Sequence, residues 1–167
     1  ESDMLTGDML RRSADRFPDK TAIIWGEAHT SYRDLNARAN QLAHAIIGLG
    51  LGLSNGGKGA KVAIISRNRT EYGIAFFGAA KSGCVLVNVS VLYAPAELAY
   101  VLAKADVEAL IYEDVFAEKI ALVKPDLTNI SHFIEIGPGS GDAVSFDYFI
   151  AGQPETEPDI ALNEDDP

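Results

Sequence analysis

The sequence predicts an α/β protein, in which a doubly wound and mostly parallel sheet carries flanking helices and a short N-terminal hairpin. Short apolar, β-branched runs begin at Val62, Val85, Ala109 and Phe133, so that successive starts differ by 23, 24 and 24 residues. Amphipathic helical segments lie between these runs. Continuous apolar strands are typical of parallel sheets buried on both faces, because right-handed crossovers place helices there.

The chain before these strands should form a helix and a hairpin. A helical face carries Met9, Leu10 and Phe17, and Pro18 would end that helix. The following segment, TAIIWGEAHTSY, predicts two short strands around a turn at residues 26–28.

A longer helix should follow the hairpin. Ser31 and Asp34 resemble a capping box, in which the serine hydroxyl accepts an unsatisfied backbone N–H. Apolar residues then recur at alternating spacings of four and three, which predicts one buried stripe: Leu35, Ala39, Leu42, Ile46 and Leu49.

Three further helices are expected between the strands. Asn68, with Glu71 three residues later, would cap the first, and Pro95 would open the second. Their apolar stripes are Tyr72, Ala75, Phe76, Ala79 and Ala80 for the first helix, Leu98, Val101, Leu102 and Ala105 for the second, and Phe116, Ile120 and Val123 for the third.

The composition changes after Gly137. Residues 137–143 read as a flexible loop and residues 146–152 as a short helix, and residues 153–167 are rich in proline and acidic side chains. We therefore expect an α/β lobe over residues 1–150 and an acidic connector over residues 151–167. No internal sequence repeat accompanies the strand spacing, so the rhythm is that of βα units and not of a solenoid.

Charge and composition exclude several classes of partner. The formal net charge is −10, and no cluster of Lys or Arg interrupts it, so contact with nucleic acid or an anionic membrane surface is disfavoured. No apolar run reaches the length of a membrane span. Cys84 is the single cysteine and cannot form an internal disulfide, so we expect a soluble protein of a reducing compartment, the cytoplasm.

The glycine-rich segment GLGLGLSNGGKG, residues 48–59, has the composition of a phosphate-binding loop. Such a loop follows a strand and opens a helix, whose N-terminal amides then face the anion. Here the order is reversed, because the glycines follow a helix and precede a strand. Lys58 also lacks a following Ser or Thr. We interpret Gly48, Gly50 and Gly52 as helix termination followed by a surface loop.

The turn SRNRTEY, residues 66–72, has the order that a ligand site needs, since it follows a strand and opens a helix. Arg67 and Arg69 with the helix N-terminus offer an anion site similar to the phosphate loop of flavodoxins. The alternative is an Asn68 cap with solvated arginines, which we favour because the turn lacks the glycines that let a backbone wrap a phosphate.

The remaining reactive side chains form no catalytic group. We expect His29 in a turn, His44 away from the buried face of its helix and His132 at the start of a strand, with no second metal ligand at zinc-like spacing. Cys84 reads as a packed core thiol. The carboxylates of PETEPD and NEDDP lack a calcium-loop register, so a solvated acidic tail is expected. The sequence motifs therefore identify no catalytic, cofactor-binding or metal-binding residue.

Two stretches resemble the opening of the adenylate-forming acyl-CoA synthetases, the AMP-dependent synthetase and ligase family. Residues 16–51 match the F-P-D-K element, the T/S-Y-x-E/D-L helix start, the L-A pair and the terminal glycine, through residues 17–20, Gly26, residues 31–35, Leu42, Ala43 and Gly50. Residues 61–114 match a strand, an N-x-x-E helix, a K-x-G turn, a strand and an E-L-x-Y helix, through Asn68, Glu71, Lys81, Gly83, Glu97, Leu98 and Tyr100. Many relatives carry a proline near Val87, which is absent here.

The resemblance implies an enzyme that condenses a carboxylic acid of the fatty-acid class with ATP to an acyl-adenylate and then transfers the acyl group to coenzyme A. Magnesium would accompany the ATP. The family's phosphate-gripping loop, ribose-contacting aspartate and C-terminal lysine cannot be mapped onto any residue here. The chain is therefore expected to be an incomplete N-terminal lobe of a larger ligase, inactive alone, which binds the missing remainder of its own chain or self-associates.

Two rival functions remain open at this point. One is a flavodoxin-like FMN electron carrier that uses the turn at residues 66–72. The other is a non-catalytic α/β interaction module that is complete at this length.

Overall fold

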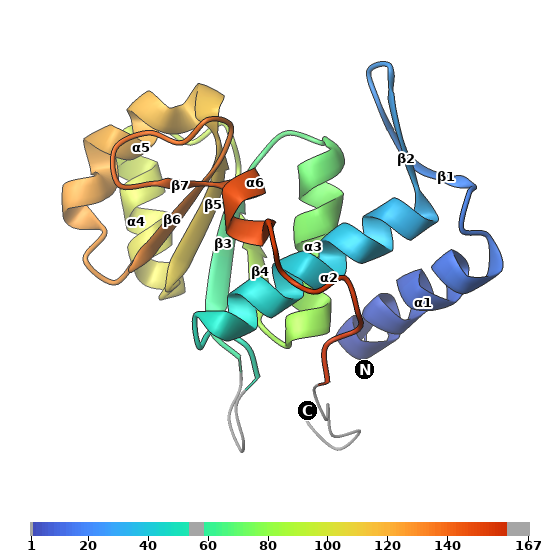
Figure 1. The fold of residues 1–167 in the computed structure, drawn as a ribbon. Coiled ribbons are helices and arrows are strands. Elements are labelled where there is room, and N and C mark those ends of the chain that lie inside the picture. The colour runs from blue at the N-terminus through green and yellow to red at the C-terminus, as the bar shows by residue number, and fades with distance from the viewer. Residues whose placement is uncertain (1, 54–58, 160–167) are drawn as a thin grey trace. The chain divides into compact units, whose positions relative to one another are not determined.

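The computed structural model describes residues 2–53 and 59–159 (Figure 1). The chain divides into two compact units, which are described separately. The first unit comprises Glu1–Gly59, Asn68–Val85 and Ile150–Pro167, and the second comprises Ala60–Arg67 and Leu86–Phe149.

In its described residues, the first unit contains three helices and a hairpin. Their bounds are α1 (Ser2–Arg16), β1 (Thr21–Trp25), β2 (Ala28–Ser31), α2 (Tyr32–Gly48) and α3 (Thr70–Ser82). The antiparallel pair β1–β2 confirms the predicted hairpin. Helices α2 and α3 pack against each other, and α1 contacts both.

The start of α2 is as predicted. Ser31 is the N-cap, and its Oγ accepts a hydrogen bond from the backbone N–H of Asp34 at 3.1 Å. The predicted stripe is buried from Leu35 to Ile46, and Leu49 lies just past the helix as a half-buried C-cap.

Helix α3 differs from the prediction at its cap and on its buried face. The N-cap is Arg69, whose side chain makes no capping hydrogen bond, and not Asn68. Phe76 is exposed, whereas Ile74 and Gly78 are buried. The helix is rich in small residues, and Gly78 allows α2 to approach so closely that an added Cβ would lie 2.8 Å from the Leu42 side chain. Contact with α2, and not the distribution of large apolar residues, decides which face is buried.

The N-terminal helix also buries a narrower face than expected. Leu10 is buried, but Met9 and Phe17 are exposed. Helix α1 ends at Arg16, two residues before Pro18, as the restriction on residues preceding proline favours.

The second unit contains the predicted sheet. Its elements are β3 (Lys61–Ile65), β4 (Val85–Asn88), α4 (Pro95–Ala105), β5 (Ala109–Glu113), α5 (Ala117–Val123), β6 (His132–Ile136), β7 (Val144–Ser145) and α6 (Phe146–Ile150), with short 3₁₀ turns at Asp114–Phe116 and Lys124–Asp126. The strand order is β4-β3-β5-β6-β7. The pairs β3–β5, β5–β6 and β6–β7 are parallel. Strand β7, which has only two residues, was not predicted.

This strand order confirms the doubly wound fold class. The chain runs from β3 to β4 at one edge and then returns past β3 to build β5, β6 and β7 in the other direction. Helices α4 and α5 lie side by side against one face of the sheet (Figure 1). The core between them contains Ala63, Ile65, Val89, Leu98, Leu102, Val107, Leu110, Tyr112, Ile120, Val123, Leu127 and Ile130.

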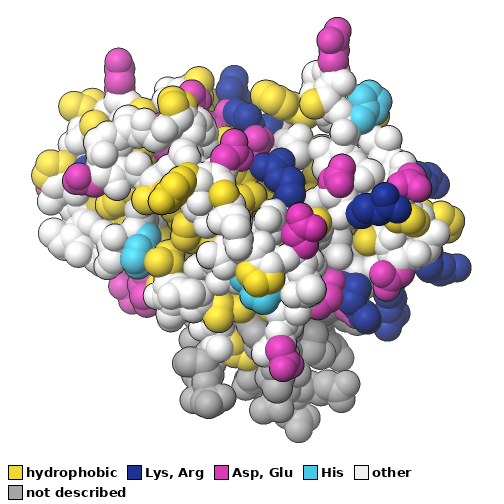
Figure 2. All heavy atoms as spheres, viewed as in Figure 1, with side chains coloured by type: hydrophobic (Ala, Val, Ile, Leu, Met, Phe, Trp, Pro, Cys, Tyr) yellow, Lys and Arg dark blue, Asp and Glu magenta, His cyan; other side chains and the backbone are white. Residues whose placement is uncertain are grey.

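Apolar side chains also remain on the surface of the second unit. Figure 2 shows hydrophobic side chains gathered over β6 and β7, where Val144 is exposed. Among the helices of the described residues, none is both long and apolar enough to cross a membrane.

Candidate functional site

The strand order places a topological switch point between β3 and β5. The chain leaves β3 toward β4 on one side and leaves β5 toward β6 on the other. In open α/β sheets, ligands bind outside the carboxyl ends of the strands at such a point. Here those ends are Ile65, followed by Ser66 and Arg67, and Glu113.

The switch point is closed by an ion pair. The backbone N–H of Arg67 donates to Glu113 Oε1 at 2.6 Å, and the Arg67 guanidinium donates to Oε1 at 3.2 Å and to Oε2 at 2.9 Å. The Glu113 side chain is fully buried, whereas that of Arg67 is 57% exposed. A buried carboxylate with this set of charge-assisted donors is well satisfied. The arginine that we considered for an anion site therefore neutralises Glu113.

The second arginine of the same turn is also engaged. Arg69 Nε donates to Glu71 Oε2 at 2.7 Å, and its guanidinium lies 4.3 Å from the centroid of the Trp25 ring. Both side chains of the Arg69–Glu71 pair are largely buried. The expectation of solvated arginines is thus wrong for Arg69, and Asn68 is not the cap. The arginines of this turn form ion pairs within the protein and are not presented to a phosphate.

The glycine-rich segment ends a helix, as predicted. Helix α2 runs through Gly48, Leu49 is its C-cap, and Gly50 adopts the left-handed conformation with φ +77°. Gly52 lies so close to Ile47 and to the Ser82 carbonyl that an added Cβ would be 2.9 Å from each. Lys58 lies outside the described residues.

The histidines and the cysteine do not come together as a reactive group. His29 lies within β2, not in the turn; His132 begins β6; and Cys84 is buried. His44 is half-buried, and its Nε2 lies 2.8 Å from the Thr156 carbonyl. Over residues 2–53 and 59–159, no three His, Cys, Asp or Glu side chains group as a metal ion would require.

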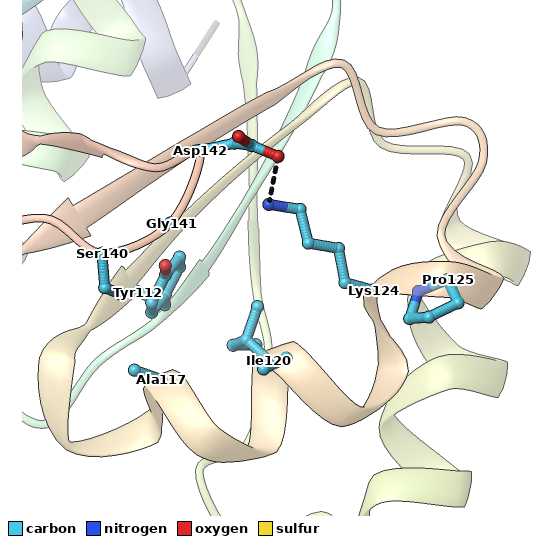
Figure 3. A pocket seen from close by; sticks show the side chains of 9 residues that line it. Tyr112, Ala117, Ile120, Lys124, Pro125, Ser140, Gly141 and Asp142 are labelled. Carbon is cyan, nitrogen blue, oxygen red and sulfur yellow. Dashed lines mark ion pairs between the residues drawn. The ribbon is translucent and has the colours of Figure 1, made fainter.

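A hollow of about 520 Å³ lies beside α5 in the second unit. Figure 3 shows Lys124 and Asp142 facing each other across its rim, with Nζ and Oδ2 3.8 Å apart. Ala117, Ile120 and Ala121 form its apolar wall. Burial, and next the nearby charge of Glu135, raise the pKa of Tyr112 to about 12. The phenol therefore stays neutral at physiological pH. Sequence reasoning did not single out this hollow.

Sequence reasoning also missed the contacts of the acidic segment. Glu157 accepts hydrogen bonds from Lys81 Nζ on α3 at 2.5 Å and from Asn36 Nδ2 on α2 at 3.1 Å. Asn40 Nδ2 donates to the Glu155 carbonyl at 2.8 Å. Although most of residues 151–159 are exposed, the carboxylate of Glu157 is not merely solvated. The signal was the four-residue spacing of Asn36, Asn40 and His44, which places three polar side chains on one helix ridge.

The comparison with known families decides the identity of the chain. The family model described as AMP-binding enzyme matches residues 10–165. The chain belongs to the AMP-binding enzyme family. Two curated relatives illustrate the match. A medium/long-chain fatty-acid–CoA/3-oxocholest-4-en-26-oate–CoA ligase of Mycobacterium marinum is 37% identical over 133 residues, 80% of this chain and 23% of the relative. A long-chain fatty-acid–CoA ligase of Escherichia coli is 33% identical over 146 residues, 83% of this chain and 25% of the relative.

Solved structures of AMP-binding enzymes share the fold. The anthranilate CoA ligase AuaEII, solved in complex with anthranoyl-AMP, superimposes with a TM-score of 0.83 at 28% identity, over 90% of this chain and 28% of that one. The chain thus spans about a quarter of the length of the relatives that it matches. Its sheet and helices correspond to the N-terminal part of this family of ligases.

Proposed function

We propose that this chain is the N-terminal part of an ATP-dependent acyl-CoA ligase. The carboxylate of a fatty acid would attack the α-phosphorus of ATP, which forms an acyl-adenylate and releases pyrophosphate. The thiol of coenzyme A would then attack the acyl carbonyl, form the thioester and release AMP and a proton. Adenylation is needed first because a carboxylate is a poor electrophile until one of its oxygens becomes part of a good leaving group.

The observation that carries this proposal is the family match over residues 10–165, together with relatives that are named fatty-acid–CoA ligases. The charged groups at the switch point and in the adjoining turn are paired within the protein, which suits a supporting role in the fold. The switch point holds an ion pair, and the arginines of the turn at residues 66–72 are engaged. This arrangement does not favour a flavodoxin-like FMN site or give an interaction module a distinct binding face.

The residues that contact the nucleotide are proposed to follow Pro167. Residues 1–150 would form the lobe, and residues 151–167 would lead into the phosphate-gripping loop. Within the described residues, no three candidate metal ligands group together. We assign no catalytic, cofactor-binding or metal-binding residue to this chain. The remainder of the parent chain would supply them, and the parent enzyme would act in the cytoplasm.

The test compares the isolated 167-residue chain with the parent polypeptide encoded by the uninterrupted reading frame. Each protein is incubated with ATP, Mg²⁺, coenzyme A and a series of fatty acids of increasing length. Pyrophosphate release is followed continuously, and acyl-CoA and AMP are identified by mass spectrometry. Omitting coenzyme A should leave the acyl-adenylate on the parent enzyme, where hydroxylamine traps it as the hydroxamate.

We expect the parent polypeptide to form acyl-CoA and AMP in equal amounts and the 167-residue chain to form neither. A parent polypeptide that released ADP and phosphate, or that required no carboxylic acid, would contradict the proposed ligase. Acyl-adenylate formed by the 167-residue chain alone would contradict the assignment of the nucleotide contacts to residues beyond it.

A further inference from the structure

We propose that Lys81 and the polar ridge of α2 hold Glu157 as an anchor that fixes the path of residues 153–157 along the first unit, and that this anchor positions the nucleotide-contacting segment of the parent ligase. The second half of this inference rests on the proposed function. The first half concerns the geometry of residues 153–157 alone. We call the cluster a tail anchor; it comprises Asn36, Asn40, His44, Lys81 and Glu157.

The tail anchor holds both a side chain and the backbone. The two carboxylate oxygens of Glu157 accept from different elements, Oε1 from Asn36 on α2 and Oε2 from Lys81 on α3. Backbone carbonyls of the same segment are held as well: Gln41 Nε2 donates to the Gln153 carbonyl at 3.2 Å, and the Glu155 and Thr156 carbonyls meet Asn40 and His44 at 2.8 Å. A segment held along its backbone has a defined path, which a single surface ion pair would not give it.

The Lys81 ammonium needs this partner. Its side chain is 3% exposed, against 38% for Glu157, and burial lowers the pKa of Lys81 despite the opposing effect of Glu157. Arg11 on α1 also lowers the pKa of Lys81, whereas Asp8 on the same helix raises it. A buried charge that loses its partner is strongly unfavourable, so Lys81 holds Glu157 more firmly than exposed ion pairs are held.

The ridge has acceptors left over. Within the described part of the chain, the side-chain oxygens of Asn36 and Asn40 are buried and have no hydrogen-bond partner. Asn40 itself is 1% exposed. Buried amide oxygens are normally satisfied, so this ridge offers two acceptors to N–H donors of further chain or to ordered water. Such acceptors beside the anchored segment suit a ridge that guides more backbone than residues 153–157.

The anchor limits how far the chain beyond it can reach. If residues 153–157 were not held, these five residues would extend that reach by roughly 17 Å. A longer tether lowers the effective concentration of whatever it carries. Holding residues 153–157 therefore limits the positions that a segment attached after them can occupy. In the parent ligase, these residues would lead toward the nucleotide.

The first experiment tests the anchor in the 167-residue chain. Backbone ¹⁵N order parameters of residues 153–159 are compared in the unchanged protein, Glu157→Gln, Lys81→Met and Asp159→Asn. Asp159 is exposed, and its substitution removes the same charge from the same segment. We expect the order parameters of residues 155–157 to fall from about 0.85, typical of rigid backbone, to below about 0.6 in Glu157→Gln and to stay unchanged in Asp159→Asn. If Lys81→Met does not fold, Glu157→Gln decides the result alone. Equal order parameters in Glu157→Gln and the unchanged protein would overturn the anchor.

The second experiment tests positioning in the parent polypeptide. We expect Glu157→Gln to raise the KM for ATP about tenfold, with the KM for the fatty acid and kcat changed less than threefold, and Glu157→Asp to restore part of the loss. A general loss of stability would instead lower the active fraction and leave both KM values unchanged. Low order parameters with an unchanged KM for ATP would overturn the positioning role and leave the ligase assignment standing. A parent polypeptide without ligase activity would overturn the proposed function and the positioning role together, whereas the order parameters would still decide the anchor.

Discussion

Tyr112 shows how one buried side chain makes stability depend on pH. Its phenol lies among Ser140 and Glu135, and burial is the main reason that its pKa is raised from 10.0 to about 12. Because the folded protein holds this proton more tightly than the unfolded chain, the contribution is fully present below pH 10 and is lost as the pH rises toward 12. The free energy of unfolding should therefore fall in this window.

The prediction is tested by urea unfolding of the unchanged protein and Tyr112→Phe at several pH values from 9 to 12. The unchanged protein should lose stability relative to Tyr112→Phe as the pH rises through the window. Tyrosinate absorbance gives a second measurement, since five of the six tyrosines would remain in the variant and the latest-titrating signal should disappear. Parallel stability curves for the two proteins would show that Tyr112 titrates as it does in the unfolded chain.

Residue-level properties also limited what the sequence could predict. The cap at Ser31 and the thiol at Cys84 depend on neighbours in the chain, and both were predicted correctly. Glu113, in contrast, is 46 residues from Arg67, and Glu157 is 76 residues from Lys81. Nothing local distinguishes a carboxylate that will be buried against a distant cation from one that remains in water. Both pairs therefore escaped prediction.

At the level of elements, helix α3 contains two glycines whose surroundings differ. A Cβ at Gly78 would meet the Cβ, Cγ and Cδ2 atoms of Leu42 at 2.8 to 3.0 Å, whereas a Cβ at Gly73 would meet only the Ile23 side chain, its Cδ1 tip at 2.6 Å. Leu42 is fully buried and cannot move away, but the Ile23 tip is free to rotate.

Alanine at these two positions should therefore have opposite effects. Alanine favours a helix over glycine by about 1 kcal/mol, and overpacking of a filled contact costs about 1 to 3 kcal/mol. We expect Gly78→Ala to lower the free energy of unfolding by up to about 2 kcal/mol and Gly73→Ala to leave it unchanged or raise it by up to about 1 kcal/mol. Chemical denaturation of both variants measures this difference. If Gly78→Ala were as stable as Gly73→Ala, α2 and α3 would not be in the close contact described.

The order of elements was the most predictable part of the fold. The strand starts at residues 85 and 109 were correct, and those expected at residues 62 and 133 each lie one residue earlier in the structure. These strands are continuous apolar runs, and such runs are recognisable without tertiary information. The face of α3 was predicted only in part, because Ala75, Ala79 and Ala80 are buried as expected but Phe76 is exposed. Strand β7, with two residues, is too short to leave a pattern.

At the level of the whole molecule, exposed apolar side chains predict self-association. In the second unit, Leu92 is 88%, Tyr148 77% and Leu122 70% exposed. Soluble monomers seldom leave extensive apolar surface uncovered, and the matched relatives are about three and a half times as long. We therefore expect that additional chain covers some of these side chains in the parent protein.

Light scattering after size exclusion should give the 167-residue chain an average mass above that of one chain, increasing with protein concentration. Replacement of Leu92, Leu122 and Tyr148 by serine should shift the mass toward that of a monomer without loss of secondary structure. If the unchanged 167-residue chain remained monomeric at high concentration and bound no hydrophobic dye, this expectation would be contradicted.

The composition of the first unit from three separate stretches has a consequence for synthesis. The ammonium of Lys81 is made 76 residues before the carboxylate that it binds. At ordinary rates of translation, this interval lasts about 4 to 15 seconds. During that time α1, α2 and α3 are already available, but the partner that neutralises Lys81 does not yet exist. Meanwhile β4, β5, β6 and β7, which follow Lys81 in the chain, are completed in order. The first unit, although its synthesis begins first, would thus be the later of the two units to complete its fold on the ribosome.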